Sequence, residues 1–359
     1  MNSVDNKIQD KQRYEYLDTY RFIAVFFVII YHWLPGYFSF FPFGKIGVDM
    51  FFVLSGFLIT EILLRQRDMA EAAKHSKAKA LFIFYGRRAL RIFPLYYIIV
   101  FLFLFLGYEI VKSNSGYFLL YGVNFLIMNK QEWLNMVTHL WSLSVEEQFY
   151  LLWPFFILFF SRKYLVYAVS GLIILSLVYV SGSYVWGTDY SFVNLFFCVS
   201  TLGAGGILAF FKNRLIVTTT KKTVWLLALL MVVFYAVSLK HPNVIWFHLA
   251  AVFYSTAFLI ILLRVKNKAL DFFFKNRVLS WLGKISYGLY LFHNITPWLL
   301  RNLKGTETEF KVLNFSILPA TENGYITLVS QFALLFLIAS LSWYIIEKPI
   351  NSLKDKLNY

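Results

Sequence analysis

The chain has 359 residues, of which 59% are hydrophobic and only 15% are charged, and its formal net charge is +15. A soluble domain carries about 25% charged residues, so this composition excludes an ordinary soluble protein and indicates a helical membrane protein. The positive charge does not indicate nucleic acid as a partner, because Lys and Arg gather in short segments between apolar runs, as membrane topology requires. The single cysteine, Cys198, excludes an intramolecular disulfide.

Apolar runs long enough to cross a bilayer recur along the chain. We therefore predict an all-α, polytopic transmembrane helical bundle of about ten spans. They lie near residues 16–36, 46–64, 90–108, 144–160, 164–181, 191–211, 223–239, 243–263, 279–300 and 325–346.

Basic residues concentrate in every second connection between these runs, so we predict that both termini are cytoplasmic. The predicted organisation is a cytoplasmic tail over 1–15, one membrane domain over 16–347 and a cytoplasmic tail over 348–359. No cleavable signal peptide is expected, because residues 1–14 are polar and no small-residue cleavage site follows the first apolar run.

The first span reads YLDTYRFIAVFFVIIYHW over residues 16–33 and contains Asp18, Arg21 and His32. Charged groups in hydrocarbon are costly, so such residues usually face a protein interior or a wet cavity. Arg21 and His32 are eleven residues apart, which places them on nearly one helical face and roughly 16 Å apart along the axis. The alternative is that Arg21 pairs with Asp18 and that His32 lies at the membrane interface.

The second span begins GKIGVDMFFVLSGFLIT and places Asp49 within a turn of its outer end, at the depth expected for His32. An aspartate beside a histidine fixes its tautomer and raises its basicity, as a general base requires. The alternative is that Asp49 caps the helix or meets the interface.

The inner loop and the third span meet in the segment FYGRRALRIFPLYY, in which Arg87, Arg88 and Arg91 start the membrane span on the cytoplasmic side. Guanidinium groups bind phosphate oxygens in pairs, so three of them at a membrane mouth suit a phosphate-bearing polyanion. Contact with lipid head groups is the alternative interpretation.

The fourth span starts within THLWSLSVEEQFYLLWP, after a short apolar piece over 117–128 that we predict to be a half-helix. Two adjacent glutamates, Glu146 and Glu147, stand about 100° apart on a helix, so at most one is expected to point into the bundle. We choose Glu146 as the inward one.

The later spans offer fewer candidates. The spans between 164 and 263 read as scaffold without intramembrane charge, and His293 in the ninth span is expected to be a satisfied core histidine. Because the sequence contains no Walker loop, dinucleotide fingerprint, HExxH pair or cysteine cluster, we expect no metal and no permanently bound cofactor.

Several blocks together resemble acyltransferase family 3 of integral membrane proteins: RFIAVFFVIIYHW after YLD, GKIGVDMFFVLSGFLIT, GRRALRIFP, LWSLSVEEQFYLLWP, ISYGLYLFH and the terminal IEKP. They occur in the family's order over nearly the whole chain. Thr19 and Tyr20 depart from the commoner Gly-Leu of the first span. No esterase-like domain follows the last span, so the membrane domain over 16–347 is expected to transfer the acyl group alone.

The resemblance implies transfer of an acyl group, usually acetyl, from cytoplasmic acyl-CoA to a hydroxyl of an extracytoplasmic or lipid-linked saccharide, in the bacterial cytoplasmic membrane. It implies His32 as the catalytic centre with Arg21 as its partner, and Asp49 and Glu146 as polar pore positions. It assigns Arg88 and Arg91 to acyl-CoA.

The chemistry of acyl transfer agrees with these assignments. The reaction needs a base or nucleophile, charge stabilisation at the oxyanion and a clamp for the donor. His32 beside Asp49 can supply the base, Arg21 the positive charge, and Arg87 with its two neighbours the clamp. The rival function is a proton-coupled transporter or flippase of an anionic solute, which would use Arg21, His32 and Glu146 as a relay.

Overall fold

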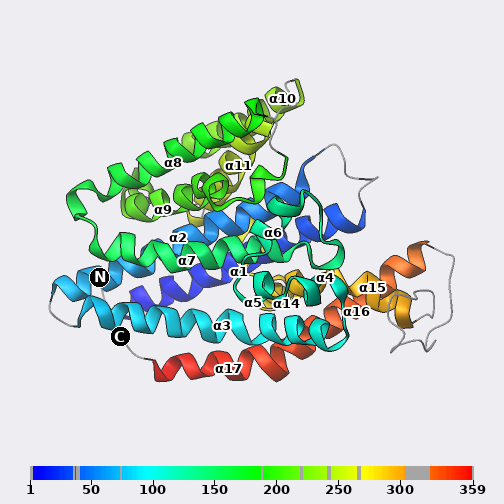
Figure 1. Ribbon diagram of the computed structural model, residues 1–359. Helices are drawn as coiled ribbons and strands as arrows, with labels where there is room; N and C mark the ends of the chain where they lie inside the picture. Colours follow the sequence, from blue (N-terminus) through cyan, green and yellow to red (C-terminus); the bar gives the residue numbers. More distant parts are fainter. Residues whose placement is uncertain are drawn as a thin grey trace. The chain divides into compact units, whose positions relative to one another are not determined.

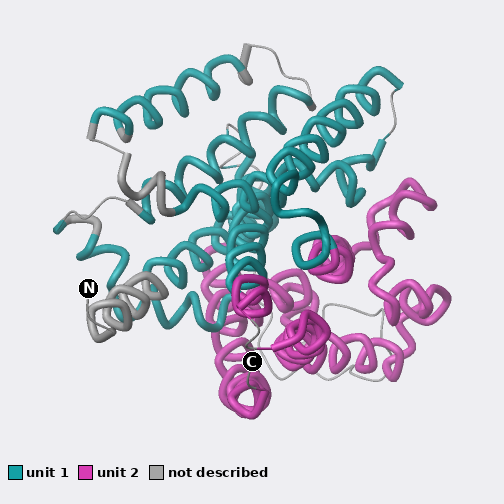
Figure 2. The backbone as a smooth tube through the Cα atoms, turned by 90° about the vertical axis from the view of Figure 1, so that its left-hand side faces the viewer, with its two compact units in different colours: residues 1–65, 156–286 teal, residues 66–155, 287–359 magenta. Residues whose placement is uncertain are grey.

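A computed structural model describes residues 3–34, 37, 41–72, 75–186, 189–218, 221–240, 244–264, 268–303 and 324–357. Most of the predicted outer loop 301–324 lies outside these residues. The described residues contain helices and no strand, as predicted. They divide into two compact units, unit 1 over 1–65 and 156–286 and unit 2 over 66–155 and 287–359 (Figure 2).

Unit 1 contains α1 (Ser3–Trp33), most of α2 (Phe43–Glu71), α8 (Arg162–Val185), η2 (Ser191–Val193), α9 (Leu195–Thr218), α10 (Lys221–Lys240), α11 (Val244–Arg264), α12 (Lys268–Phe274) and α13 (Arg277–Lys284). Within it, α8, α9 and α11 pack against one another, and α1 packs against α13 (Figure 1).

Unit 2 contains α3 (Lys77–Phe105), α4 (Glu109–Ser113), α5 (Ser115–Leu119), α6 (Val123–Lys130), η1 (Asn135–Val137), most of α7 (Leu140–Phe159), α14 (Ser286–Phe292), α15 (Ile295–Leu303), α16 (Gly324–Ser342), a π-helical turn (Trp343–Glu347), α17 (Lys348–Ser352) and η5 (Leu353–Lys356). Here α17 lies alongside α3 (Figure 1).

Six helical segments of the described chain are long and apolar enough to cross a membrane. They are Phe43–Glu71, Lys77–Phe105, Arg162–Val185, Leu195–Lys212, Ile245–Leu263 and Gly324–Lys356. Helices also form at the predicted spans near 16–36, 144–160 and 223–239, but their described residues do not provide a stretch that is both long and apolar enough to cross a membrane. The short apolar piece near 117–128 forms parts of two short helices, α5 and α6, and not the single half-helix predicted.

The predicted ninth span, 279–300, is wrong as one continuous helix. It is divided into α13, α14 and α15, with breaks at Ile285 and at residues 293–294. Pro297 in the first turn of α15 explains the second break, because a proline ring clashes with the carbonyl four residues earlier, here that of His293. Irregular backbone at membrane depth is tolerated where protein covers it, and His293 is fully buried.

The last helix also differs from the prediction, because it continues beyond Glu347. A π-helical turn joins α16 to α17, and Ser342 Oγ donates to Glu347 Oε1 at 3.0 Å across it. Gly288 of α14 lies against the same two side chains, at 2.9 Å and 3.3 Å from where its Cβ would stand. The turn thus places a buried carboxyl group against α14.

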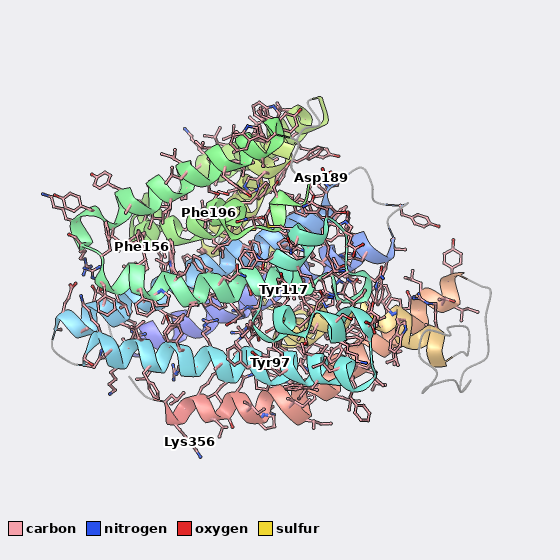
Figure 3. The ribbon with its side chains drawn as sticks, viewed as in Figure 1. Tyr97, Tyr117, Phe156, Asp189, Phe196 and Lys356 are labelled. Atoms are coloured by element: carbon pink, nitrogen blue, oxygen red, sulfur yellow. The ribbon has the colours of Figure 1, made fainter. Side chains whose placement is uncertain are left out.

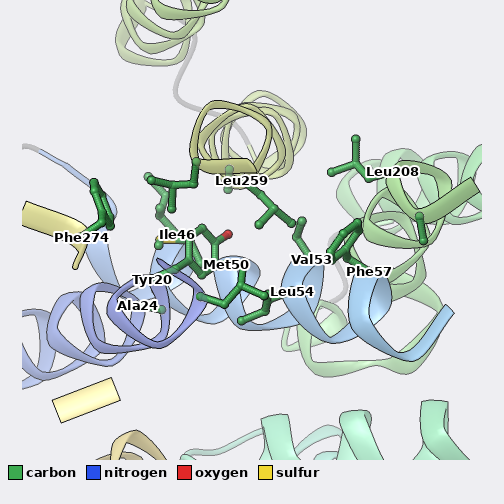
Figure 4. Close-up of a cluster of buried hydrophobic side chains, with 14 residues drawn as sticks. Tyr20, Ala24, Ile46, Met50, Val53, Leu54, Phe57, Leu208, Leu259 and Phe274 are labelled. Atoms are coloured by element: carbon green, nitrogen blue, oxygen red, sulfur yellow. The ribbon is translucent and has the colours of Figure 1, made fainter. Parts of the chain in front are cut away.

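The core of unit 1 is an apolar cluster contributed by α1, α2, α9, α11 and α12, and Figure 4 shows it in close-up. Its largest members include Tyr20, Met50, Phe57, Leu259 and Phe274. In lipid there is no hydrophobic driving force between helices, so close backbone approach and hydrogen bonds must hold them together.

Two glycines bring α2 and α9 into direct backbone contact. A Cβ at Gly56 of α2 would stand 1.8 Å from the carbonyl oxygen of Leu202 in α9. In the reverse direction, a Cβ at Gly205 of α9 would stand 2.0 Å from the carbonyl oxygen of Val53 in α2. Neither position can hold a larger residue without moving a backbone.

We predict that Gly56→Ala lowers the free energy of unfolding by about 1–3 kcal/mol, the usual cost of overpacking. Thermal unfolding of the purified protein in lipid measures the change. Gly171→Ala in α8 is the matched control, because nothing lies within 4 Å of its Cβ position, and alanine favours a helix by roughly 1 kcal/mol over glycine. Equal stability of the two variants would contradict the contact.

Candidate functional site

Arg21 forms an ion pair within its own helix. Its Nη1 lies 2.5 Å from Asp18 Oδ1, and both side chains are largely shielded, at 14% and 16% exposure. Asp18 is fixed in turn, because Gly283 of α13 lies so close that a Cβ there would stand 1.9 Å from the Asp18 carbonyl oxygen. The pair that the sequence offered as the alternative interpretation is therefore present.

His32 lies in the last turn of α1, and its side chain is exposed. Its ring stands edge-on to Tyr31, with 5.2 Å between the ring centroids. Eleven helical residues separate it from Arg21, or about 16 Å along the axis. One small reacting group cannot touch both side chains.

Asp49 is buried. Contrary to the prediction from the sequence, it does not hydrogen-bond to His32. Its Oδ2 accepts from Lys45 Nζ at 2.9 Å, one turn earlier on α2, and its Oδ1 accepts from Thr201 Oγ1 of α9 at 3.3 Å. The partner from α9 reaches Asp49 because the glycine contact draws the two helices together.

A second histidine, His248 of α11, lies close to this aspartate in the fold. It is fully buried, its Nε2 lies 2.7 Å from Ser200 Oγ, and Lys45 acts on it electrostatically. Ser200 also donates to the Phe197 carbonyl at 3.0 Å. The spans predicted to be scaffold thus supply buried polar groups beside Asp49, and the apolar sequence around His248 gives no signal of this.

The three predicted arginines of unit 2 lie within α3 and do not start that helix, because α3 already begins at Lys77. Arg87 Nη2 donates to the Lys354 carbonyl at 3.2 Å. All three guanidinium groups act electrostatically on the Lys354 ammonium group, as does the buried Glu347. Lys354 is therefore a fourth cation of this cluster, which we call the basic cluster (Arg87, Arg88, Arg91 and Lys354).

Arg88 is the member of the basic cluster that reaches toward α7. Its guanidinium carbon lies 5.2 Å from the ring centroid of Tyr150 and 5.8 Å from that of Phe84. Both Glu146 and Glu147 act on it electrostatically. Glu146 is the predicted inward acid, and its neighbour Glu147 has a solvent-shielded oxygen, Oε1.

The two buried histidines of unit 2 have structural roles. His139 Nε2 lies 3.0 Å from the Leu291 carbonyl and so must donate to it, while its Nδ1 faces the Asn294 side chain at 3.3 Å. His293 Nδ1 lies 2.6 Å from the Tyr290 carbonyl. Both rings lie at the break between α14 and α15. His293 is buried in the core, as predicted, but of its two ring nitrogens only Nδ1 forms a hydrogen bond with a described residue, so the prediction of a satisfied histidine is not met.

The predicted site residues therefore divide between the units. Unit 1 contains Arg21, His32 and Asp49, and unit 2 contains Arg87, Arg88, Arg91 and Glu146. Among the residues that the structure describes, no three His, Cys, Asp or Glu side chains are grouped so that they could hold a metal ion.

Comparison with known proteins gives a consistent result. The family model described as acyltransferase domain matches residues 14–347. The peptidoglycan O-acetyltransferase OatA of Listeria monocytogenes is 31% identical over 372 residues, covering 93% of this chain and 55% of that protein. A putative peptidoglycan O-acetyltransferase of Bacillus subtilis is 30% identical, covering 94% and 54%. A putative O-acetyltransferase of Staphylococcus aureus is 29% identical, covering 77% and 49%.

The chain thus spans about half the length of these relatives. No solved structure matches it significantly.

We predict that Lys45→Met lowers the free energy of unfolding by about 2 kcal/mol, because it leaves Asp49 buried with only Thr201 as a partner. The double variant Lys45→Met, Asp49→Asn should lose less unfolding free energy than Lys45→Met alone. Asparagine is neutral and still accepts a hydrogen bond from the threonine hydroxyl. A double-mutant cycle on thermal unfolding measures the coupling. Additive losses would show that the ion pair does not form.

Proposed function

The chain belongs to the acyltransferase family whose domain model matches residues 14–347, as its sequence blocks predicted, and on that premise we propose that it is an integral membrane O-acetyltransferase. It takes an acetyl group from cytoplasmic acyl-CoA and transfers it to a hydroxyl of an extracytoplasmic or lipid-linked saccharide. The relatives are named peptidoglycan O-acetyltransferases, so a peptidoglycan-type glycan is the acceptor we propose.

The basic cluster is the observation that carries the donor assignment. Four cationic side chains from α3 and η5 lie within electrostatic range of one another. Positive charges that lie so close together repel one another. A polyanion between them would relieve this repulsion and would therefore be bound strongly. Arg91 makes no hydrogen bond with any described residue of the chain, which leaves its planar donors available for the phosphates of CoA.

Membrane orientation agrees with this assignment. With both termini in the cytoplasm, the half of α3 that carries the arginines and the end of η5 lie on the cytoplasmic side, where acyl-CoA is found. His32, at the end of α1, then faces the outer side, where the acceptor arrives. We place the protein in the bacterial cytoplasmic membrane, since the relatives are bacterial proteins.

His32 is the residue we assign to catalysis. An exposed imidazole at the outer end of α1 can take the proton of the acceptor hydroxyl or carry the acyl group itself. Arg21 is too far along the helix to stabilise charge at His32, so we assign it to positioning, through its pair with Asp18. Asp49, held by Lys45 and Thr201, joins α2 to α9 rather than tuning His32, and Glu146 acts on Arg88.

We predict that His32→Ala abolishes transfer of label from acetyl-CoA to the glycan while the protein still inserts and unfolds normally, because general base catalysis contributes roughly 10²- to 10⁴-fold. His75→Ala is the matched control, since His75 lies in the connection between α2 and α3 and contacts the Gln66 side chain of α2 at 2.9 Å. Wild-type turnover by His32→Ala would overturn the assignment.

We predict that Arg91→Gln weakens acetyl-CoA binding about tenfold or more, because a charge-assisted hydrogen bond to phosphate is lost. The dependence of binding on salt should also fall. Lys356→Gln is the matched control, because Lys356 is exposed and projects away from α17 (Figure 3). If the wild type does not bind acetyl-CoA at all, the donor assignment fails and the transporter alternative gains support.

A further inference from the structure

A cage of tyrosines lies in unit 2, formed by α3 and the segment after α5. The rings of Tyr96 and Tyr121 are stacked with centroids 4.1 Å apart, and Tyr97 stands edge-on to Tyr121 at 5.9 Å. Two of the hydroxyl groups are used within the fold. Tyr96 donates to the Phe118 carbonyl at 2.8 Å and Tyr97 to the Leu119 carbonyl at 2.9 Å.

Tyr121 differs from its neighbours, because its hydroxyl is buried and has no hydrogen-bonding partner among the described residues. Its backbone is in the left-handed region, with φ of 51°, which residues other than glycine rarely adopt and which strains the chain. Gln148 Nε2 of α7 donates to the Tyr121 carbonyl at 2.9 Å. The strained residue is therefore held in one position.

Glu147 of α7 faces the same cage. It acts electrostatically on Tyr96, Tyr97 and Tyr121, and its Oε1 is shielded from solvent without a donor among the residues described. A buried carboxyl oxygen without a partner costs several kcal/mol. Tyr287, the remaining tyrosine near Glu147, donates instead to the Ile92 carbonyl at 2.8 Å.

The cage thus offers one fixed acceptor, Glu147 Oε1, and one fixed donor, the Tyr121 hydroxyl, within electrostatic range of each other. A secondary amide presents the complementary pair, an N–H and a carbonyl. We propose that Glu147 and Tyr121 form a subsite for the amide-bearing pantetheine arm of the acyl-CoA donor. This inference rests on the proposed function.

The position of the cage relative to the basic cluster supports the same ligand. Glu147 acts on Arg88 as well as on Tyr96, and these two residues of α3 lie eight positions apart, about 12 Å along the helix. Phosphates at Arg88 and Arg91 would leave the arm to run along α3 toward Glu147. One helix then carries both the charged and the amide-binding parts of the donor site.

Two ligands test the subsite: acetyl-CoA, which has the amide arm, and adenosine 3′,5′-bisphosphate, which has phosphates but no arm. Tyr121→Phe should weaken acetyl-CoA binding roughly fivefold, and Glu147→Leu roughly tenfold, with the bisphosphate unchanged. Glu147→Gln retains an acceptor oxygen and should stay closer to wild type. Calorimetry on the full chain in lipid nanodiscs measures both ligands.

The matched controls are Tyr117→Phe and Glu132→Gln. Tyr117 on α5 (Figure 3) makes no hydrogen bond through its hydroxyl with a described residue, and Glu132 is 61% exposed. Thermal unfolding of every variant is measured alongside, so that a general loss of stability in unit 2 is recognised.

Three results distinguish the possibilities. Variants that bind acetyl-CoA like wild type overturn the subsite, and so do variants that weaken both ligands equally, because that pattern is a general distortion of unit 2. A wild type that binds neither ligand overturns the donor assignment itself. The subsite is supported if Tyr121→Phe and Glu147→Leu weaken the binding of acetyl-CoA but not of the bisphosphate, and if Glu147→Gln binds acetyl-CoA nearly as well as the wild type does.

Discussion

The contact between the backbones of α2 and α9 is the constraint on which the polar interior of unit 1 depends. Lipid tails are as apolar as leucine, so two helices gain little by merely covering apolar side chains. Gly56 and Gly205 allow each helix to touch the carbonyl oxygens of the other. Only at that distance can Thr201 reach Asp49, and a buried carboxylate with fewer partners would be a liability in this setting.

Features with local causes could be predicted from the sequence. Apolar runs give the helices. The three arginines are near neighbours in sequence, so their gathering on α3 follows from helix geometry alone. Family membership also rests on local blocks. Lys354 could not be foreseen as their companion, because it joins them only through the packing of the last helix on α3.

The failures share one physical cause, which is that side-chain direction depends on packing between distant segments. Asp49 lies at the expected place in α2, but its partners are Lys45 on the same helix and Thr201, 152 residues away, rather than a residue of α1. Glu146 and Glu147 point about 100° apart, and the sequence does not say which face meets the tyrosines. The broken ninth span is different. Pro297 is present in the sequence, and its clash with the carbonyl of His293 is enough to predict the second break.

The π-helical turn at Trp343–Glu347 has a consequence for comparing related chains. Such a turn is equivalent to one residue inserted into an α-helix, and it shifts the phase of everything that follows by about 100°. Lys354 joins the arginines in that shifted phase. A relative with one residue fewer here would keep an uninterrupted apolar helix and the same terminal charges, yet would direct its lysine to another side. Counting basic residues at this end of the chain therefore says little unless the length of the turn is counted too.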